Sequence, residues 1–276
     1  MEILLRSYAK INLNLKIMGV REDGYHEVDT VMQTVSLCDE ITLSEEPSGI
    51  KILSQDPYMP KDESNLAYRA ARLFFANADE KEGMSIEIDK NIPMGAGLGG
   101  GSANAAAVLL GLNELYGNPL DIKRLLNLAA EIGSDVPFFI TGGRARCEGR
   151  GEYVKKLPSN NKSWYVIVKP NFSVSTKWAY QEYDRKIKYQ KSNIKNNVFT
   201  NDLEEVVMQS YPEIERIKKE LCEEGAKNAI MSGSGSAVWA EVENEMAGKS
   251  IKEMMTSANR EAYLVHSVPH GVEIVR

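Results

Sequence analysis

A glycine-rich segment constrains what this chain can fold into more than any other feature. Residues 93–107 read PMGAGLGGGSANAAA, with five glycines in the seven positions 95–101 and an alanine-rich helix former directly after them. Glycine lets a backbone approach a ligand closely, and the first turn of a helix offers unpaired N–H donors with partial positive charge. A plain connection between a strand and a helix needs only one or two glycines. The segment, which we call the glycine loop (residues 93–102), therefore predicts an anion site suited to a nucleotide phosphate.

Two familiar phosphate-binding patterns fit the glycine loop poorly. A P-loop requires Lys and then Ser or Thr after its last Gly, whereas Gly100 is followed here by Gly101 and Ser102. Residues 95–100 satisfy G-x-G-x-x-G, but a Rossmann strand runs directly into the first Gly, and residues 91–94 intervene. Asp121 lies near the distance of a ribose-binding carboxylate, yet it follows Asn-Pro and reads as a helix cap. A dinucleotide-dependent reductase remains an alternative hypothesis.

Length and charge limit the classes of partner. The 276 residues suit one large or two modest domains, and the net charge of −6, without a long basic run, disfavours nucleic acid and anionic membranes. The longest apolar stretch, residues 105–112, is far shorter than the roughly 20 residues of a spanning helix, and the start lacks a signal-peptide pattern. We therefore expect a soluble cytoplasmic protein, a monomer or homodimer, that acts on a small molecule.

The cysteines predict neither a disulfide framework nor a cysteine-rich zinc site. Cys38, Cys147 and Cys222 are far apart in the sequence and form no C-x-x-C pair. We expect buried or inert thiols.

The hydrophobic pattern of the first half mixes strands with helices. Residues 10–17 alternate polar and apolar side chains, which predicts a half-buried strand with Lys10 and Asn12 on its polar face. The other elements predicted in this half are strands within 25–37, 41–43 and 85–89, and helices at about 65–76, 102–116 and 121–132.

A polar run at residues 158–162 indicates a domain boundary, because a continuously apolar strand begins at Trp164. We predict an α+β chain with domains at 1–157 and 158–276. The lysine- and asparagine-rich residues 186–197 predict a solvated loop. The elements predicted beyond the boundary are helices at about 201–209, 212–224 and 245–257, and strands near 229, 237–242, 262–265 and 272–275.

A second loop alternates glycine with hydroxyl side chains. Residues 231–236 read MSGSGS, and their N–H and O–H donors suit contact with phosphate or substrate. Taken alone, this segment fits a hairpin turn better.

Three segments together resemble the GHMP small-molecule kinases: the strand residues 9–12 (AKIN), the glycine loop, and the second loop at 231–236. A closer likeness, to the branch of that family whose substrate is a cytidine-diphosphate-linked methylerythritol, lies in residues 21–26, 133–139 and 148–152. The resemblance spans nearly the whole chain. It implies ATP-dependent phosphorylation of the 2-hydroxyl of the methylerythritol portion, in isoprenoid precursor synthesis. It also implies an N-terminal domain like ribosomal protein S5 domain 2 and a ferredoxin-like C-terminal domain.

The resemblance implies a role for each matched residue. Asp135 corresponds to the base that accepts the substrate hydroxyl proton, and Lys10 would keep this carboxylate ionised and oriented. No protein metal ligand is matched, so Mg²⁺ is expected to enter with ATP, held by Ser102, the phosphates and water. The implied ATP-binding residues are Asn65, Pro93, Met94, Gly95, Ala96, Gly97, Leu98, Gly99, Gly100, Gly101 and Ser102. The implied substrate-binding residues are Asn12, Tyr25, His26, Thr176, Tyr180, Gly233, Ser234 and Gly235.

Three hypotheses of different classes stay open at this point. The chain is a kinase for the cytidine-linked substrate or for another GHMP substrate, a dinucleotide-dependent reductase, or a nucleotide-binding module without catalysis. Tyr25, His26 and Tyr180 carry the choice of substrate, because flat aromatic faces and an imidazole can read a cytosine ring.

Overall fold

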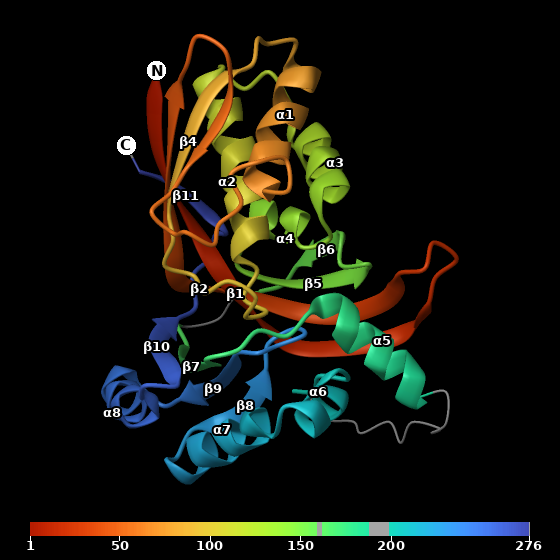
Figure 1. Cartoon of the computed structure of the whole chain (residues 1–276), viewed down its shortest axis with the longest axis vertical. Coiled ribbons are helices and arrows are strands. Elements are labelled where there is room, and N and C mark those ends of the chain that lie inside the picture. The colour runs from red at the N-terminus through yellow and green to blue at the C-terminus, as the bar shows by residue number, and fades with distance from the viewer. Residues whose placement is uncertain (159–161, 188–198, 276) are drawn as a thin grey trace.

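Two sheets organise the computed structural model, which describes residues 1–158, 162–187 and 199–275. Within those residues, the strands form a seven-stranded and a four-stranded sheet. Figure 1 shows the larger sheet with helices α1 to α4 on one side, and the smaller sheet with α6 to α8 at the opposite end of the molecule. The expected α+β fold class is confirmed.

The larger sheet is built around one long hairpin. Strands β1 (Glu2–Val20) and β2 (His26–Glu45) pair antiparallel along most of their length, with register shifts between Tyr8/Ala9, Asn12/Asn14 and Ile17/Gly19. Such bulges increase the twist of a ribbon and bend it. The sheet order is β11-β1-β2-β4-β3. Strand β5 pairs with residues 28–33 of β2, and β6 pairs with β5. The remaining strands are β3 (Gly49–Leu53), β4 (Gly83–Asp89), β5 (Arg144–Gly149), β6 (Tyr153–Lys156) and β11 (Val272–Val275).

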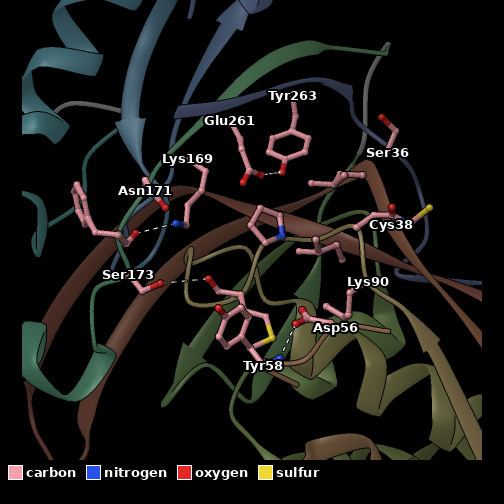
Figure 2. Close-up of a pocket in the computed structure, with 16 residues that line it drawn as sticks. Ser36, Cys38, Asp56, Tyr58, Lys90, Lys169, Asn171, Ser173, Glu261 and Tyr263 are labelled. Atoms are coloured by element: carbon pink, nitrogen blue, oxygen red, sulfur yellow. Dashed lines mark hydrogen bonds between the residues drawn. The ribbon is translucent and has the colours of Figure 1, made fainter. Parts of the chain in front are cut away.

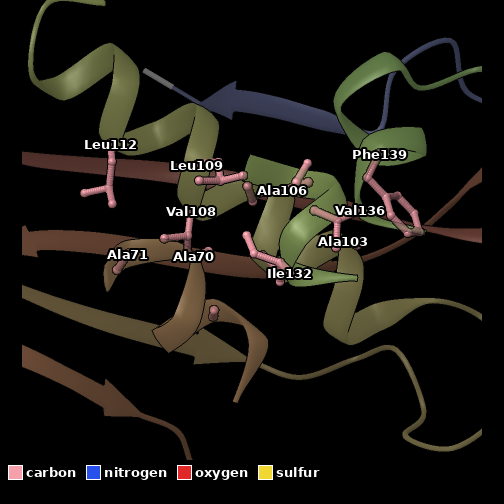
Figure 3. Packing of buried hydrophobic residues seen from close by; sticks show 14 of the residues in the cluster. Ala70, Ala71, Ala103, Ala106, Val108, Leu109, Leu112, Ile132, Val136 and Phe139 are labelled. Atoms are coloured by element: carbon pink, nitrogen blue, oxygen red, sulfur yellow. The ribbon is translucent and has the colours of Figure 1, made fainter. Parts of the chain in front are cut away.

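The helix that follows the glycine loop lies at the centre of the first core. Helix α2 (Gly100–Leu115) is buried on almost every side, and its alanines let neighbouring helices approach closely (Figure 3). At Gly111 an added Cβ would lie 2.7 Å from a Leu43 methyl and 2.8 Å from a Leu5 methyl, so α2 rests directly on β1 and β2. The helices around it are α1 (Leu66–Ala78), α3 (Ile122–Ile132) and α4 (Val136–Thr141).

The smaller sheet has the antiparallel order β10-β7-β9-β8. Helices α7 (Pro212–Glu223) and α8 (Glu245–Met255) pack against this sheet. Other side chains of its strands, including Tyr165, Ile167 and Trp239, form a buried cluster with Ile11 and Leu13 of β1. This cluster holds the two sheets together. The other elements are β7 (Trp164–Pro170), β8 (Lys227–Met231), β9 (Val238–Val242), β10 (Arg260–His266), α5 (Thr176–Ile187) and α6 (Glu204–Ser210).

Most predicted helices and strands lie close to their predicted positions. Asp121 caps α3 as predicted, through a 2.7 Å bond from the Arg124 N–H. Strands β3, β5 and β6 and helices α4 and α5 were not among the predicted elements. The lysine-rich segment falls largely outside the described residues. The boundary at residue 158 remains a prediction, and β11 from the far end of the chain pairs with β1 in the larger sheet.

Candidate active site

Lys10 and Asp135 meet beside the glycine loop. The Lys10 Nζ of β1 lies 3.7 Å from the Asp135 Oδ2, which stands at the first turn of α4. Asp135 occupies the N-cap position of α4, but its side chain makes no capping hydrogen bond. Its carboxylate is 36% exposed, whereas the lysine side chain is 4% exposed. The pair therefore presents a carboxylate to solvent with a buried cation behind it.

Burial works against the charge on Lys10. Desolvation lowers the pKa of Lys10 below its ordinary value, and the neighbouring Asp135 carboxylate opposes part of that shift. The ammonium also donates to the Asn12 Oδ1 at 2.5 Å, and the Asn12 amide donates to the Thr30 hydroxyl at 2.9 Å. Asn12 thus fixes the direction in which Lys10 points.

The alternating pattern predicted that Lys10 and Asn12 share the polar face of a half-buried strand; the two side chains do share a face, but that face is buried. Both residues are 3% exposed. The second loop covers them, since a Cβ on Gly233 would lie 3.3 Å from the Asn12 Oδ1 and 3.4 Å from the Lys10 Nζ. The cover comes from more than 200 residues away, so the local pattern of β1 carries no sign of it.

The glycine loop and the second loop interlock. The Ser232 hydroxyl donates to the Gly97 carbonyl at 2.9 Å, and the Ala237 N–H donates to the Ala96 carbonyl at 3.1 Å. Gly97 has φ +76°, and a Cβ there would lie 2.1 Å from the Ser232 carbonyl oxygen. The loop is also tied to β1, because the Lys10 N–H donates to the Leu98 carbonyl at 2.9 Å. These contacts place the start of α2 against the Lys10–Asp135 pair.

The N-terminus of α2 retains free donors. Its N-cap is Gly99, which has φ +73° and supplies no side chain to cap the helix. The first N–H groups of a helix have no partner within the helix, and together with the macrodipole they attract anions. Asn65 caps α1 through a 2.9 Å bond from the Ala67 N–H, and the next residue, Leu66, lies 3.8 Å from the Cβ position of Gly101. Asn65 is thereby placed beside the loop.

A cavity of about 1060 Å³ opens next to the first residues of the glycine loop. Pro93 and Met94 line it together with Lys90 and Tyr58, and residues of β7, β10 and the segment after β7 form the opposite wall (Figure 2). The Ser173 hydroxyl lies 3.5 Å from the Met94 carbonyl at the rim. Lys90 was not predicted as a site residue, because a single lysine after a strand gives no distinctive signal.

The predicted base-reading residues lie at the junction of the β1–β2 hairpin and α5. The rings of His26 and Tyr180 are 4.7 Å apart with an interplanar angle of 31°. The His26 Nε2 is 2.8 Å from the Asp184 Oδ1, a partner on α5 that the sequence did not suggest. Tyr25 is 55% exposed, and the Arg150 guanidinium covers its ring at 5.1 Å from the centroid. The structure thus brings Tyr180 to His26 and leaves Tyr25 open.

The second loop also reaches α5. The hydroxyls of Thr176 and Ser234 lie 2.9 Å apart, and the positive φ values of Gly233 (+56°) and Gly235 (+89°) turn the loop around Ser234. The second loop therefore contacts the glycine loop, Asn12 of β1 and α5. Among the cysteines, Cys147 is buried as expected, whereas Cys222 is exposed because it lies near the solvent-facing end of α7.

The described part of the chain contains neither a cluster of metal-ligating side chains nor a membrane-spanning helix. No group of three or more His, Cys, Asp or Glu side chains in residues 1–158, 162–187 and 199–275 is arranged to hold a metal ion. None of the helices described is long and apolar enough to cross a bilayer.

Comparison with known proteins identifies the family. The family profile described as the GHMP kinases N terminal domain matches residues 65–143, and the GHMP kinases C terminal profile matches residues 190–261. A 4-diphosphocytidyl-2-C-methyl-D-erythritol kinase of Syntrophomonas wolfei is 43% identical and covers 96% of this chain and 98% of its own length. A protein of the same name from Clostridium botulinum is 39% identical, with 96% and 99% coverage.

Solved structures agree with the sequence comparisons. A crystal structure of 4-(cytidine 5'-diphospho)-2C-methyl-D-erythritol kinase is 33% identical and superposes with a TM-score of 0.81, covering 97% of this chain and 99% of that one. A homoserine kinase from Cytophaga hutchinsonii, 21% identical with a TM-score of 0.77 over 99% of this chain and 97% of its own, shares the fold. The chain therefore belongs to the GHMP kinase family, within its 4-diphosphocytidyl-2-C-methyl-D-erythritol kinase branch, and is an ATP-dependent small-molecule kinase.

Proposed function

We propose that this enzyme transfers the γ-phosphoryl group of MgATP to the 2-hydroxyl of 4-diphosphocytidyl-2-C-methyl-D-erythritol, in isoprenoid precursor synthesis. The relatives that carry this substrate in their names match the chain along its whole length. The observation that carries the mechanism is the Lys10–Asp135 pair at 3.7 Å, beside a helix N-terminus with free donors.

Asp135 acts as the general base. Its carboxylate is partly open to solvent and makes no capping hydrogen bond to α4, so a substrate hydroxyl can approach it. Phosphoryl transfer passes through a loose transition state, and the site must mainly align the nucleophile and stabilise spread negative charge. The Lys10 ammonium lies 3.7 Å from this carboxylate and supplies positive charge where negative charge develops as the hydroxyl loses its proton.

The glycine loop holds the ATP phosphates. Its backbone N–H groups and the start of α2 provide donors without adding bulk, and Gly97 and Gly99 allow the close approach. Mg²⁺ arrives as part of MgATP, with the Ser102 hydroxyl as the matched protein contact and no cage of protein carboxylates in the described residues. The cavity beside Pro93 and Met94 offers room for the rest of the nucleotide.

The cytidine portion of the acceptor binds between the β1–β2 hairpin and α5. Tyr25 offers an exposed ring face, and Tyr180 supplies a second face braced by His26. The Asp184 carboxylate anchors one ring nitrogen of His26, so the other ring nitrogen is available to the cytosine edge. Thr176, Ser234 and the two glycines beside Ser234 are the other acceptor contacts that we assign, and the Thr176 and Ser234 hydroxyls lie 2.9 Å apart.

ADP release from MgATP tests this proposal. We expect release that depends on 4-diphosphocytidyl-2-C-methylerythritol and that falls sharply in the Asp135→Asn variant, which keeps the shape of the side chain and removes the base. ATP binding should be unchanged in that variant. A folded protein that binds ATP but ignores this acceptor would withdraw the substrate, and homoserine, mevalonate and galactose would then be assayed in its place.

A further inference from the structure

A fully buried carboxylate lies beneath the glycine loop, outside the residues assigned above. Asp39 of β2 is 0% exposed. Burying an unpaired charge destabilises a fold by roughly several kcal/mol. A buried carboxylate is therefore retained only where it has a full set of hydrogen-bond and ion-pair partners. The partners of Asp39 come from both sides of the glycine loop.

One oxygen of Asp39 holds the backbone that enters the loop. The N–H groups of Asn91 and Ile92 both donate to the Asp39 Oδ1 at 2.8 Å, immediately before Pro93. The glycines that follow offer no side chains for packing. The entry to the loop is therefore fixed by this carboxylate.

The other oxygen holds a side chain from each flank of the loop. The Lys90 ammonium pairs with the Asp39 Oδ2, and the amide of Asn104, the fifth residue of α2, donates to the same oxygen at 2.8 Å. Asn104 is 2% exposed and also donates to the Ser7 hydroxyl at 2.8 Å. One buried carboxylate thus ties together the segment before the loop and the helix after it.

Lys90 connects this arrangement to the nucleotide. Its Nζ lies 3.1 Å from the Cβ position of Gly100, and the residue lines the cavity beside Met94. An ammonium against a helix N-terminus is unfavourable by itself, because both carry positive charge. Asp39 compensates that repulsion and keeps the cation where a polyanionic nucleotide meets it.

We propose that Asp39 is a positioning residue for ATP: it fixes the Lys90 ammonium and both ends of the glycine loop in the arrangement that receives the nucleotide. The inference rests on the proposed role of the glycine loop in holding the phosphates. Asp39 itself does not touch the ligand and acts through the groups that it binds.

The Asp39→Asn variant is a sharp test. An amide oxygen can still accept from Asn91 and Ile92, but its NH₂ group would face the Lys90 ammonium and the Asn104 amide, so donors would oppose donors. The matched control is Glu213→Gln on α7, away from the loop, which also removes a carboxylate that accepts from a largely buried cation, Arg260 of β10, at 2.7 Å.

The measurements are the melting temperature and the Kd for MgATP by calorimetry without the acceptor. We expect Asp39→Asn to weaken MgATP binding at least tenfold, while the KM for the acceptor stays within twofold. Glu213→Gln should lose comparable thermal stability with an unchanged Kd. An unchanged Kd in folded Asp39→Asn would overturn the proposal, because Asp39 would then only stabilise the fold.

A second variant covers the case in which Asp39→Asn fails to fold. Asn104→Leu keeps the Asp39–Lys90 pair and releases only α2, and a buried side chain at this position cannot reach the nucleotide. We expect a loss of MgATP affinity of threefold or more, and an unchanged affinity would overturn the proposal. If wild-type enzyme binds MgATP but does not phosphorylate the cytidine-linked acceptor, the proposed function fails while this comparison remains valid.

Discussion

The Lys10 ammonium and the Asp135 carboxylate lie 3.7 Å apart at the junction of β1 and α4, and only the carboxylate is open to solvent. This asymmetry separates their tasks. The exposed partner can meet a substrate, whereas the buried partner places a cation behind it. Each partner can therefore be tested separately.

Replacing Lys10 by Met should reduce turnover strongly while leaving the fold intact. Loss of one preorganised charge near the reacting groups typically costs about 10²- to 10³-fold in kcat. The partner that this change leaves behind, Asp135, is 36% exposed, so water can hydrate its carboxylate and no uncompensated buried charge remains in the fold. Steady-state kinetics and urea unfolding at neutral pH measure the two effects. Activity that falls only in step with the folded fraction would contradict the assigned role.

The pH dependence of folding should carry the signature of Lys10. Burial lowers its pKa in the folded state below the ordinary value of 10.5, so the unfolded chain binds more protons between the folded pKa and 10.5. Stability therefore rises with pH through that interval, and the penalty is fully present below the folded pKa. Urea unfolding from pH 7 to 10 should show wild type gaining stability relative to Lys10→Met. A constant difference across that range would refute the shift.

Two glycine substitutions separate backbone strain from steric conflict. Gly97 and Gly117 share φ +76°, but only at Gly97 would a Cβ meet other atoms, 2.1 Å from the Ser232 carbonyl oxygen. An alanine forced into the left-handed region costs about 1–2 kcal/mol. Gly117→Ala should lose about that much stability and keep its kcat. Gly97→Ala should lose more, together with MgATP binding, as followed by calorimetry. Equal effects of the two variants would exclude a special role of the interlocked loops.

Replacing Tyr180 should weaken the binding of one substrate only, the cytidine-linked acceptor. A stacked aromatic pair contributes about 0.5–1.5 kcal/mol, so Tyr180→Leu should raise the KM for the cytidine-linked acceptor roughly two- to twelve-fold. The KM for ATP should remain as in wild type, since Tyr180 packs on His26 of the hairpin and does not line the cavity beside Met94. A parallel rise in both KM values would indicate a general disturbance of α5 instead of base recognition.

Local sequence patterns predicted much of the fold. The alternation in β1, the alanine-rich run of α2 and the Asp121 cap of α3 predicted elements that the structure contains, and the glycine loop predicted a helix start with free donors. Residues 144–149 and 153–156 form paired strands although their sequence is polar and charged. Pairing with β2 supplies their order, and a single segment carries no record of its partner strand.

The site was predicted through family resemblance more than through physics. Residue type and spacing revealed the glycine loop, but the burial of Lys10 depends on Gly233, and the setting of His26 depends on Asp184, 158 positions away. Asp39 gave no signal, because an acidic residue in a strand is ordinary until its partners are known. Contacts over such separations arise from the tertiary fold, so a linear pattern cannot encode them.

The pairing of β11 with β1 has a consequence for biosynthesis. Residues 272–275 supply the outer neighbour of Leu4 to Ser7, and the Tyr8 hydroxyl donates to Glu273 at 2.6 Å. During translation the outer edge of β1 stays unpaired until residues 272–275 have left the ribosome. An open strand edge invites association with other chains. A nascent or C-terminally clipped chain is therefore the species most exposed to misassembly, and a chaperone would act on it at this edge.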